Sequence, residues 1–226
     1  MKSGLGLNCG MDLTSPSNYR RLDEADDEHF YSVPRLVIHV DENASAALTT
    51  YFEKSLPMDG DIIDLMSSFC SHLPKHGFYK SVVGLGMNHV ELQHNSCLTD
   101  RLTHDLNKQP KLPYQDNQFD ACLISFSIQY LVKPVVLMAD VGRILRPGSM
   151  CHVAFSNRTF PTKAIAVWQT ASDLQKAELI SYYFAESKMF DAPEMKQLVA
   201  PGKGFDPLYV IRARCKSDPA NVVNPV

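Results

Sequence analysis

The sequence predicts an α/β protein built around a mostly parallel sheet, and two patterns lead to that prediction. Short continuous apolar runs, typical of strands that are buried on both faces, alternate with longer stretches of helical periodicity. The last apolar run instead alternates apolar with polar residues, which is typical of a late antiparallel strand. Right-handed crossovers bring the carboxyl ends of parallel strands to one edge of a sheet, so we expect a ligand to bind at that edge.

The strands and helices can be placed along the chain. Residues 43–56 carry apolar side chains at helical spacing, with Asp41 or Asn43 as the N-cap, and residues 135–145 form a second helical pattern. A third helical segment begins near Pro161, and a fourth follows Ser172. The expected strands occupy residues 62–66, 81–85, 119–125, 151–156 and 206–214.

Length, composition and charge exclude several classes of protein. A chain of 226 residues suits one domain with a full hydrophobic core. A net charge of −3 gives no electrostatic attraction to nucleic acid or to anionic membranes, and no apolar run approaches the roughly 20 residues that span a bilayer. The six cysteines form no C-x-x-C pair and no secretory signal is evident, so we expect reduced thiols in a cytoplasmic protein.

The chain divides into one folded domain and two flanking segments. Residues 1–28 contain Gly, Ser and Asn and an acidic run without apolar periodicity, so we expect a mobile or loosely docked arm. A single domain is expected over residues 29–215, and its first part, residues 29–59, forms a helical cap. Residues 216–226 are expected to form a frayed tail.

A series of short motifs follows the expected strands in a fixed order. These motifs are Asp64-Leu65, Val83-Gly84-Leu85, Asp105-Leu106, Leu112-Pro113-Tyr114 with Phe119-Asp120, and Arg143-Ile144-Leu145-Arg146-Pro147-Gly148. Over residues 60–157 this order resembles the class I S-adenosylmethionine-dependent methyltransferases, especially the methyltransferase-11-like branch. The strings at residues 64–68, 71–74, 84–88 and 155–158 resemble a divergent, uncharacterised branch of methyltransferase-like proteins. The resemblance implies a Rossmann-like sheet of the seven-stranded type with helices on both faces.

The resemblance also implies a cofactor and the residues around it. It implies that S-adenosyl-L-methionine binds at the strand ends and that its methyl group passes to a small molecule. In this alignment Asp105 meets the adenine amino group, Asn88 accepts a hydrogen bond from the ribose, and Met87 packs on the adenine ring. Ser67 and Ser68 are placed at the cofactor carboxylate. The implied cofactor-binding set is Asp64, Leu65, Ser67, Ser68, Gly84, Gly86, Met87, Asn88, Asp105, Leu106, Ser125 and Ser127.

Two departures from the family pattern keep a second interpretation open. The first loop of the family is rich in glycine, because the backbone must approach the cofactor closely, whereas residues 66–70 contain none. Gly86 stands where the family usually has an acidic residue that binds the ribose. The alternative is therefore a catalytically degenerate protein that serves as a binding or scaffold subunit for a protein partner.

The state of the cavity distinguishes the enzyme from the scaffold. An open cavity beside Ser67, Gly86 and Asp105 is expected of an enzyme. Side chains of Met66, Phe69 and Met87 filling that space are expected of a degenerate scaffold. Asp105 itself also suits a helix or turn cap.

Catalytic and substrate candidates are fewer. His72 lies just beyond the first-strand loop and suits a base, and the ring of Tyr130 suits packing beside the sulfonium; both also suit structural roles in a core. The candidates for substrate contact are Tyr31, Arg35, Asn157 and Arg158. Arg158 and Lys163 suit an anionic substrate group or, equally, a solvated helix start. No metal site is expected, because the histidine pairs lack a recognised ligand pattern.

Overall fold

The protein folds around a seven-stranded mixed sheet in the order β3-β2-β1-β4-β5-β7-β6. A computed structural model describes residues 13–75, 78–202 and 204–217. Neighbouring strands are parallel from β3 to β5, while β7 is antiparallel to β5 and to β6. This arrangement confirms the predicted fold class. The strands are β1 (Asp61–Leu65), β2 (Ser81–Gly86), β3 (Asp100–Thr103), β4 (Phe119–Ser125), β5 (Leu145–Phe155), β6 (Glu194–Val199) and β7 (Leu208–Arg214).

The helices begin where the sequence provides caps. Asp41 accepts a hydrogen bond from the backbone N–H of Ala44 and caps α2, and Ser172 and Gln175 form the predicted capping box of α6. Pro134 occupies the first turn of α4, where its missing N–H costs nothing. The helices are α1 (Asp27–Tyr31), α2 (Glu42–Ser55), α3 (His89–His94), α4 (Pro134–Ile144), α5 (Ala166–Thr170) and α6 (Asp173–Glu186), with short 3-10 turns η1 (Pro16–Tyr19) and η2 (Ile128–Tyr130).

The sequence patterns did not predict two of the strands, β3 and β6, and the physical reason is the same for both. β3 and β6 form the two edges of the sheet, and most of their side chains are exposed or only partly buried. A strand that buries little apolar surface carries neither a continuous apolar run nor a clear alternation. The short helix α3 is missed because its six residues span less than two turns.

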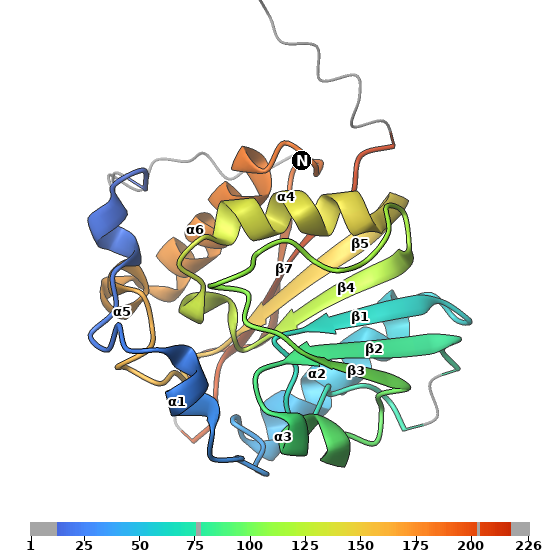
Figure 1. The fold of residues 1–226 in the computed structure, drawn as a ribbon, viewed down its shortest axis with the longest axis horizontal. Helices are drawn as coiled ribbons and strands as arrows, with labels where there is room; N and C mark the ends of the chain where they lie inside the picture. The colour runs from blue at the N-terminus through green and yellow to red at the C-terminus, as the bar shows by residue number, and fades with distance from the viewer. Residues whose placement is uncertain (1–12, 76–77, 203, 218–226) are drawn as a thin grey trace, which may run out of the picture.

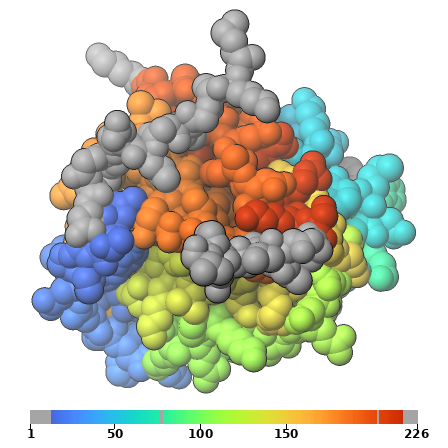
Figure 2. Space-filling model, turned by 90° about the horizontal axis from the view of Figure 1, so that it is seen from above, coloured from blue at the N-terminus to red at the C-terminus, as the bar shows by residue number. Residues whose placement is uncertain are grey.

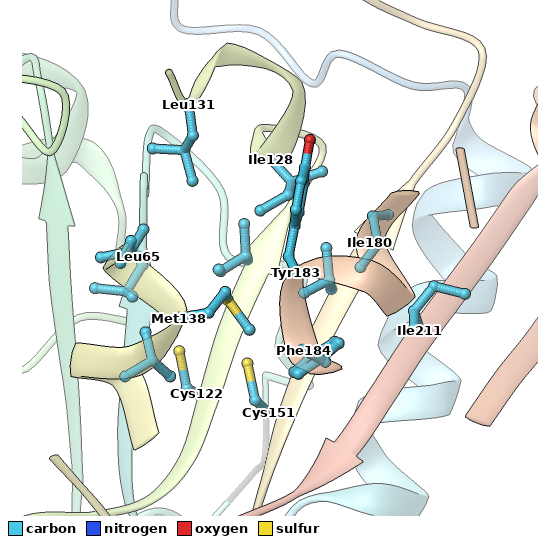
Figure 3. Close-up of a cluster of buried hydrophobic side chains, with 14 of the residues drawn as sticks. Leu65, Cys122, Ile128, Leu131, Met138, Cys151, Ile180, Tyr183, Phe184 and Ile211 are labelled. Carbon is cyan, nitrogen blue, oxygen red and sulfur yellow. The ribbon is translucent and has the colours of Figure 1, made fainter. Parts of the chain in front are cut away.

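Helices cover both faces of the sheet and bury two apolar cores (Figure 1). On one face, α4 and α6 pack over β4 and β5; Figure 3 shows Met138 and Tyr183 above Cys122 and Cys151 of the two strands, with Phe184 beside Cys151. On the other face, α2 and α3 contribute Leu48, Phe52 and Leu92 to the second core. This layering leaves the ends of the strands as the place for a ligand.

Residues 13–28, the described part of the expected arm, contact the folded domain through charged and aromatic side chains. Arg21 donates two hydrogen bonds of 2.8 Å to the carboxylate of Asp27, and Lys163, fully buried, pairs with Asp23 at 3.0 Å and Asp27 at 3.1 Å. The sequence shows the acidic residues but not the cations that pair with them in the fold, so these contacts could not be predicted from it. The blue N-terminal segment accordingly lies against the orange segment of α5 and α6 in Figure 2. Residues 1–12 lie outside the described part of the chain.

Two further expectations concern the described residues. No helix among them is long and apolar enough to cross a membrane. The described cysteines are free, namely Cys70, Cys97, Cys122, Cys151 and Cys215.

A candidate cofactor and substrate site

A cavity of about 250 Å³ opens at the carboxyl edge of β1, β2 and β4. Its walls come from the loops that follow β1, β2, β3, β4 and β5, and from the segment between α1 and α2. In Figure 1, β1 and β2 point toward the end of the sheet where α1 lies. The predicted residues that line the cavity are Tyr31, Arg35, Asp64, Ser67, Ser68, His72, Gly86, Met87, Asn88, Asp105, Leu106, Ser125, Ser127, Tyr130 and Arg158.

Three predicted site residues lie elsewhere. Leu65 is fully buried in the core. Gly84 faces Leu98, whose side chain fills the space beside it. Asn157 is exposed, and its Oδ1 accepts a 3.1 Å hydrogen bond from the hydroxyl of Ser156. Leu65 and Gly84 lie within β1 and β2, and Asn157 lies in the segment that follows β5.

The loop after β1 turns sharply over a buried carboxyl group. Met66 has a φ of 55°, a left-handed conformation that normally favours glycine. The hydroxyls of Ser67 and Ser71 each donate a 2.6 Å hydrogen bond to Oδ2 of Asp64. Burial raises the pKa of Asp64 to about 6, although the two hydrogen bonds oppose this shift. The loop therefore adopts, at Met66, a backbone conformation that usually requires glycine, although it contains no glycine.

The same loop explains why Gly86 replaces an acidic residue. The backbone N–H of Ser67 donates a 2.8 Å hydrogen bond to the carbonyl of Leu85, which draws the loop onto the end of β2. A Cβ at Gly86 would lie 2.1 Å from the carbonyl oxygen of Ser67. Any side chain at this position would therefore collide with the backbone of the loop.

Ser68 and Asn88 are held by protein partners on the far side of the cavity. The hydroxyl of Ser68 donates a 2.5 Å hydrogen bond to Oε2 of Glu91, and Oε1 of Glu91 accepts a 2.7 Å bond from the backbone N–H of Arg35. Asn88 caps α3, accepting from the N–H of Glu91, and its Nδ2 donates to the carbonyl of Tyr31 at 2.7 Å. Glu91 thus ties α3 to the first-strand loop and to the cap.

Asp105 forms a turn at the end of β3. Its Oδ1 accepts hydrogen bonds from the backbone N–H groups of Asn107 at 2.8 Å and Lys108 at 3.2 Å. Both roles considered for this residue are compatible with this geometry, because the turn uses one carboxylate oxygen and the residue lines the cavity.

Two serine hydroxyls near the end of β4 lack partners. Ser125 Oγ and Ser127 Oγ are buried, make no hydrogen bond within the described residues, and belong to residues that line the cavity. A buried hydroxyl without a partner costs roughly 1–3 kcal/mol. Because a bound ligand with a polar group would recover that cost, these hydroxyls point to a binding site.

His72 is a neutral, buried imidazole at the cavity wall. Its Nδ1 lies 3.0 Å from the hydroxyl of Ser45, and its ring packs edge-on against Phe126 at 5.3 Å. Burial, together with the smaller effect of the neighbouring His39, lowers the pKa of His72 to about 4. The ring is therefore uncharged near neutral pH.

The other predicted side chains are engaged within the protein. Tyr130 accepts a 2.9 Å hydrogen bond from the backbone N–H of Phe160 and stacks on its ring at 5.8 Å. Arg158 pairs with Asp206 at 2.8 Å, and Lys163 is committed to the buried pairs of the N-terminal segment. Lys163 therefore does not face a substrate.

Sequence patterns missed several lining residues, among them Glu91, His39 and Phe160. Glu91 carried a usable signal, because an acid three residues after an Asn resembles a capping box. His39 and Phe160 carried none, since they reach the cavity from the cap and from the segment after β5. Within the described residues, no group of three or more His, Cys, Asp or Glu side chains could hold a metal ion.

Comparison with known proteins finds a match to one family over part of the chain. Residues 66–153 match the family model of a methyltransferase domain. This part of the chain is similar to a methyltransferase domain. No curated protein sequence matches this chain significantly.

Solved structures share the fold of this chain at low identity. The cyclase SpnF is 13% identical with a TM-score of 0.56, covering 76% of this chain and 80% of its own. A possible histamine N-methyltransferase from Thermotoga maritima is 16% identical with a TM-score of 0.55, covering 77% of this chain and 91% of its own. A putative methyltransferase complexed with the Trm112 activator, from Haloferax volcanii, is 12% identical with a TM-score of 0.54, covering 77% and 91%.

Proposed function

We propose that this protein transfers a methyl group from S-adenosyl-L-methionine to a small molecule. The observation that carries the proposal is the open cavity beside Ser67, Gly86 and Asp105, whose lining residues include Ser125 and Ser127, each with a buried hydroxyl that has no partner within the described residues. This is the arrangement expected of an enzyme rather than of a collapsed pocket. Met66 and Met87 line the cavity without closing it.

The residues present fit the implied cofactor. Asp105 offers a carboxylate oxygen for an amino group, and the hydroxyls of Ser125 and Ser127 offer hydrogen bonds to polar groups. Because Gly86 has no side chain, the loop after β1 can lie in close contact with the end of β2. When bound, S-adenosyl-L-methionine supplies a methyl group that is already activated. The protein therefore has mainly to orient the acceptor and exclude water.

A scaffold role is the second candidate, because three residues expected to bind the cofactor form hydrogen bonds within the protein instead. The hydroxyls of Ser67 and Ser68 donate to Asp64 and Glu91, and the amide of Asn88 is held at both ends. A cofactor would have to share these groups or displace their partners. The structural neighbour that is complexed with an activator protein gives a precedent for a protein partner of this fold.

Calorimetric titration with S-adenosyl-L-methionine and with its demethylated product tests the proposal. We expect micromolar binding, about −8 kcal/mol, that weakens at least tenfold in Asp105→Ala and in Ser127→Ala. Asp100→Ala is the matched control, because Asp100 is exposed at the start of β3, away from the cavity. An absence of heat and of thermal stabilisation at millimolar cofactor would contradict the proposal and favour the scaffold.

A further inference from the structure

Resting on the proposed function, we infer that the methyl acceptor is an uncharged aromatic molecule, bound beneath residues 35–39 between the rings of Phe126 and Phe160. Residues 35–39 are called the cover segment below.

Two groups of aromatic rings line the cap side of the cavity. His39 packs edge-on against Phe160 at 5.4 Å, and Phe160 stacks on Tyr130. His72 packs edge-on against Phe126 at 5.3 Å, and His39 lies close enough to His72 to influence its charge. These five side chains line the cavity, and flat apolar molecules gain most from such walls.

The cover segment adds exposed apolar side chains at the mouth. Val37 is 57% exposed and Ile38 is 47% exposed, yet both line the cavity. The backbone N–H of Arg35 anchors the segment to Glu91, a residue of α3. Exposed apolar residues that line a cavity mark a surface that a ligand covers, and an apolar acceptor would bury them.

The acidic side chains of this wall already have counter-charges or hydrogen bonds. Asp27 pairs with Arg21 and Lys163, and both oxygens of Glu91 accept hydrogen bonds. A cationic acceptor would therefore find no free carboxylate on the cap side. Asp105 is the exception among the lining acids, and it lies at the end of β3, on the side assigned to the cofactor.

The two lining arginines are engaged as well. Arg158 pairs with Asp206, while the guanidinium of Arg35 donates to the carbonyls of Phe30 and Val33. It also lies 4.5 Å from the centre of the Phe30 ring and 5.3 Å from that of Phe160. An anionic acceptor would have to break these contacts to gain a counter-charge. The two neutral imidazoles offer hydrogen bonds without charge.

Three probes with the same ring system test the inference: 2-naphthol, 2-naphthoate and 2-naphthylmethylammonium. Binding is followed by probe fluorescence at neutral pH, with the full chain, with and without saturating S-adenosyl-L-methionine. We expect 2-naphthol to bind at least tenfold tighter than either charged probe and to stay bound with the cofactor present. Equal or tighter binding of a charged probe, or displacement of 2-naphthol by the cofactor, would overturn the inference.

Variants locate the site and test the role of charge. We expect Phe160→Ala to weaken 2-naphthol binding about tenfold, whereas Phe78→Ala, which removes an exposed ring that does not line the cavity, should leave it unchanged. Asp206→Asn removes the counter-charge of Arg158 and should strengthen 2-naphthoate binding several-fold. An equal effect of both phenylalanine variants, or no change for 2-naphthoate, contradicts the inference.

The two proposals fail separately in these experiments. Cofactor binding is measured with S-adenosyl-L-methionine alone, and probe binding with the naphthyl compounds. Selective 2-naphthol binding without cofactor binding would remove the proposed methyl transfer. Cofactor binding without selectivity for 2-naphthol would remove only the inference about the acceptor.

Discussion

The amino ends and the carboxyl ends of the parallel strands, called the amino edge and the carboxyl edge below, carry different polar side chains. At the amino edge, Asp61 pairs with Lys80 and Arg146, and Arg146 also pairs with Asp120 at 2.6 Å. At the carboxyl edge, the donors to the buried Asp64 carboxyl within the described part of the chain are the hydroxyls of Ser67 and Ser71, and Ser125 Oγ has no partner there. The amino edge satisfies its charges, whereas the carboxyl edge keeps polar groups available.

Backbone strain follows the same division. Asp59 and Asn117 precede β1 and β4 with positive φ, and Asp and Asn tolerate this conformation. Met66 and Phe126 follow the same two strands with φ of 55° and 57°, although their side chains are poorly suited to it. Strain of this kind persists where surrounding structure enforces it, and it concentrates at functional sites.

The largest expected effect breaks the carboxyl edge at Gly86. A Cβ there would lie 2.1 Å from the Ser67 carbonyl oxygen, a backbone atom, so the loop after β1 must move. We expect Gly86→Ala to lower the free energy of unfolding by about 3 kcal/mol, as overpacking of a rigid contact does, and to abolish cofactor binding. Urea unfolding and calorimetry measure the two effects.

Gly60→Ala is the matched change at the amino edge. Its Cβ would meet the ring carbon Cγ of Pro57 at 2.8 Å, with the nearest backbone atom at 3.2 Å. We expect a smaller loss of stability and no change in cofactor binding. Equal losses in the two variants would mean that the close approach at Gly86 is not special.

The next effect is a pH dependence of opposite sign at the two edges. Burial raises the pKa of Asp64 to about 6 from 3.8, so the folded state holds this proton more tightly than the unfolded state. The resulting stabilisation is present below the unfolded value and is lost as the pH rises through about 6. Relative to Asp64→Asn, the protein should lose about 2 kcal/mol between about pH 4.5 and 7.5.

Asp61 supplies the comparison for this measurement. A hydrogen bond from Ser81, together with Lys80 and Arg146, lowers the pKa of Asp61. Its stabilisation is therefore present above the unfolded value and is lost as the pH falls. Urea unfolding of Asp64→Asn and Asp61→Asn is extended down to about pH 3. The Asp64→Asn difference should change between about pH 4.5 and 7.5, and the Asp61→Asn difference should change with the opposite sign only below about pH 4.5. Slopes of the same sign would contradict the contrast between the edges.

The smallest effect measures the strain at Met66. In most positions alanine is more stable than glycine, but at positive φ the order reverses. We expect Met66→Gly to be about 1 kcal/mol more stable than Met66→Ala. At the amino edge, Asn117→Gly should differ little from the wild-type chain, because Asn tolerates this conformation. If Met66→Ala proves the more stable of its pair by thermal unfolding, the loop is not strained at this position.

The sequence predicted the interior of the fold better than its borders. Strands β1, β2, β4 and β7 each carry a pattern that burial imposes on side chains, and the caps at Asp41 and Ser172 are local signals. The edge strands β3 and β6 bury too little to leave such a pattern. The docking of residues 13–28 depends on Lys163, which is distant in sequence and could not be paired with Asp23 or Asp27 beforehand.

For the site, the sequence by itself determined which loops carry polar residues after the parallel strands, since strand order and crossover handedness bring those loops together. Only the tertiary structure decided what each residue does there. It closed the glycine-free loop onto Gly86, held Ser67 and Ser68 on carboxylates, and left the hydroxyls of Ser125 and Ser127 unpaired. The reason is physical: periodicity records which side chains are buried, whereas hydrogen-bond partners depend on contacts between segments that are distant in the chain.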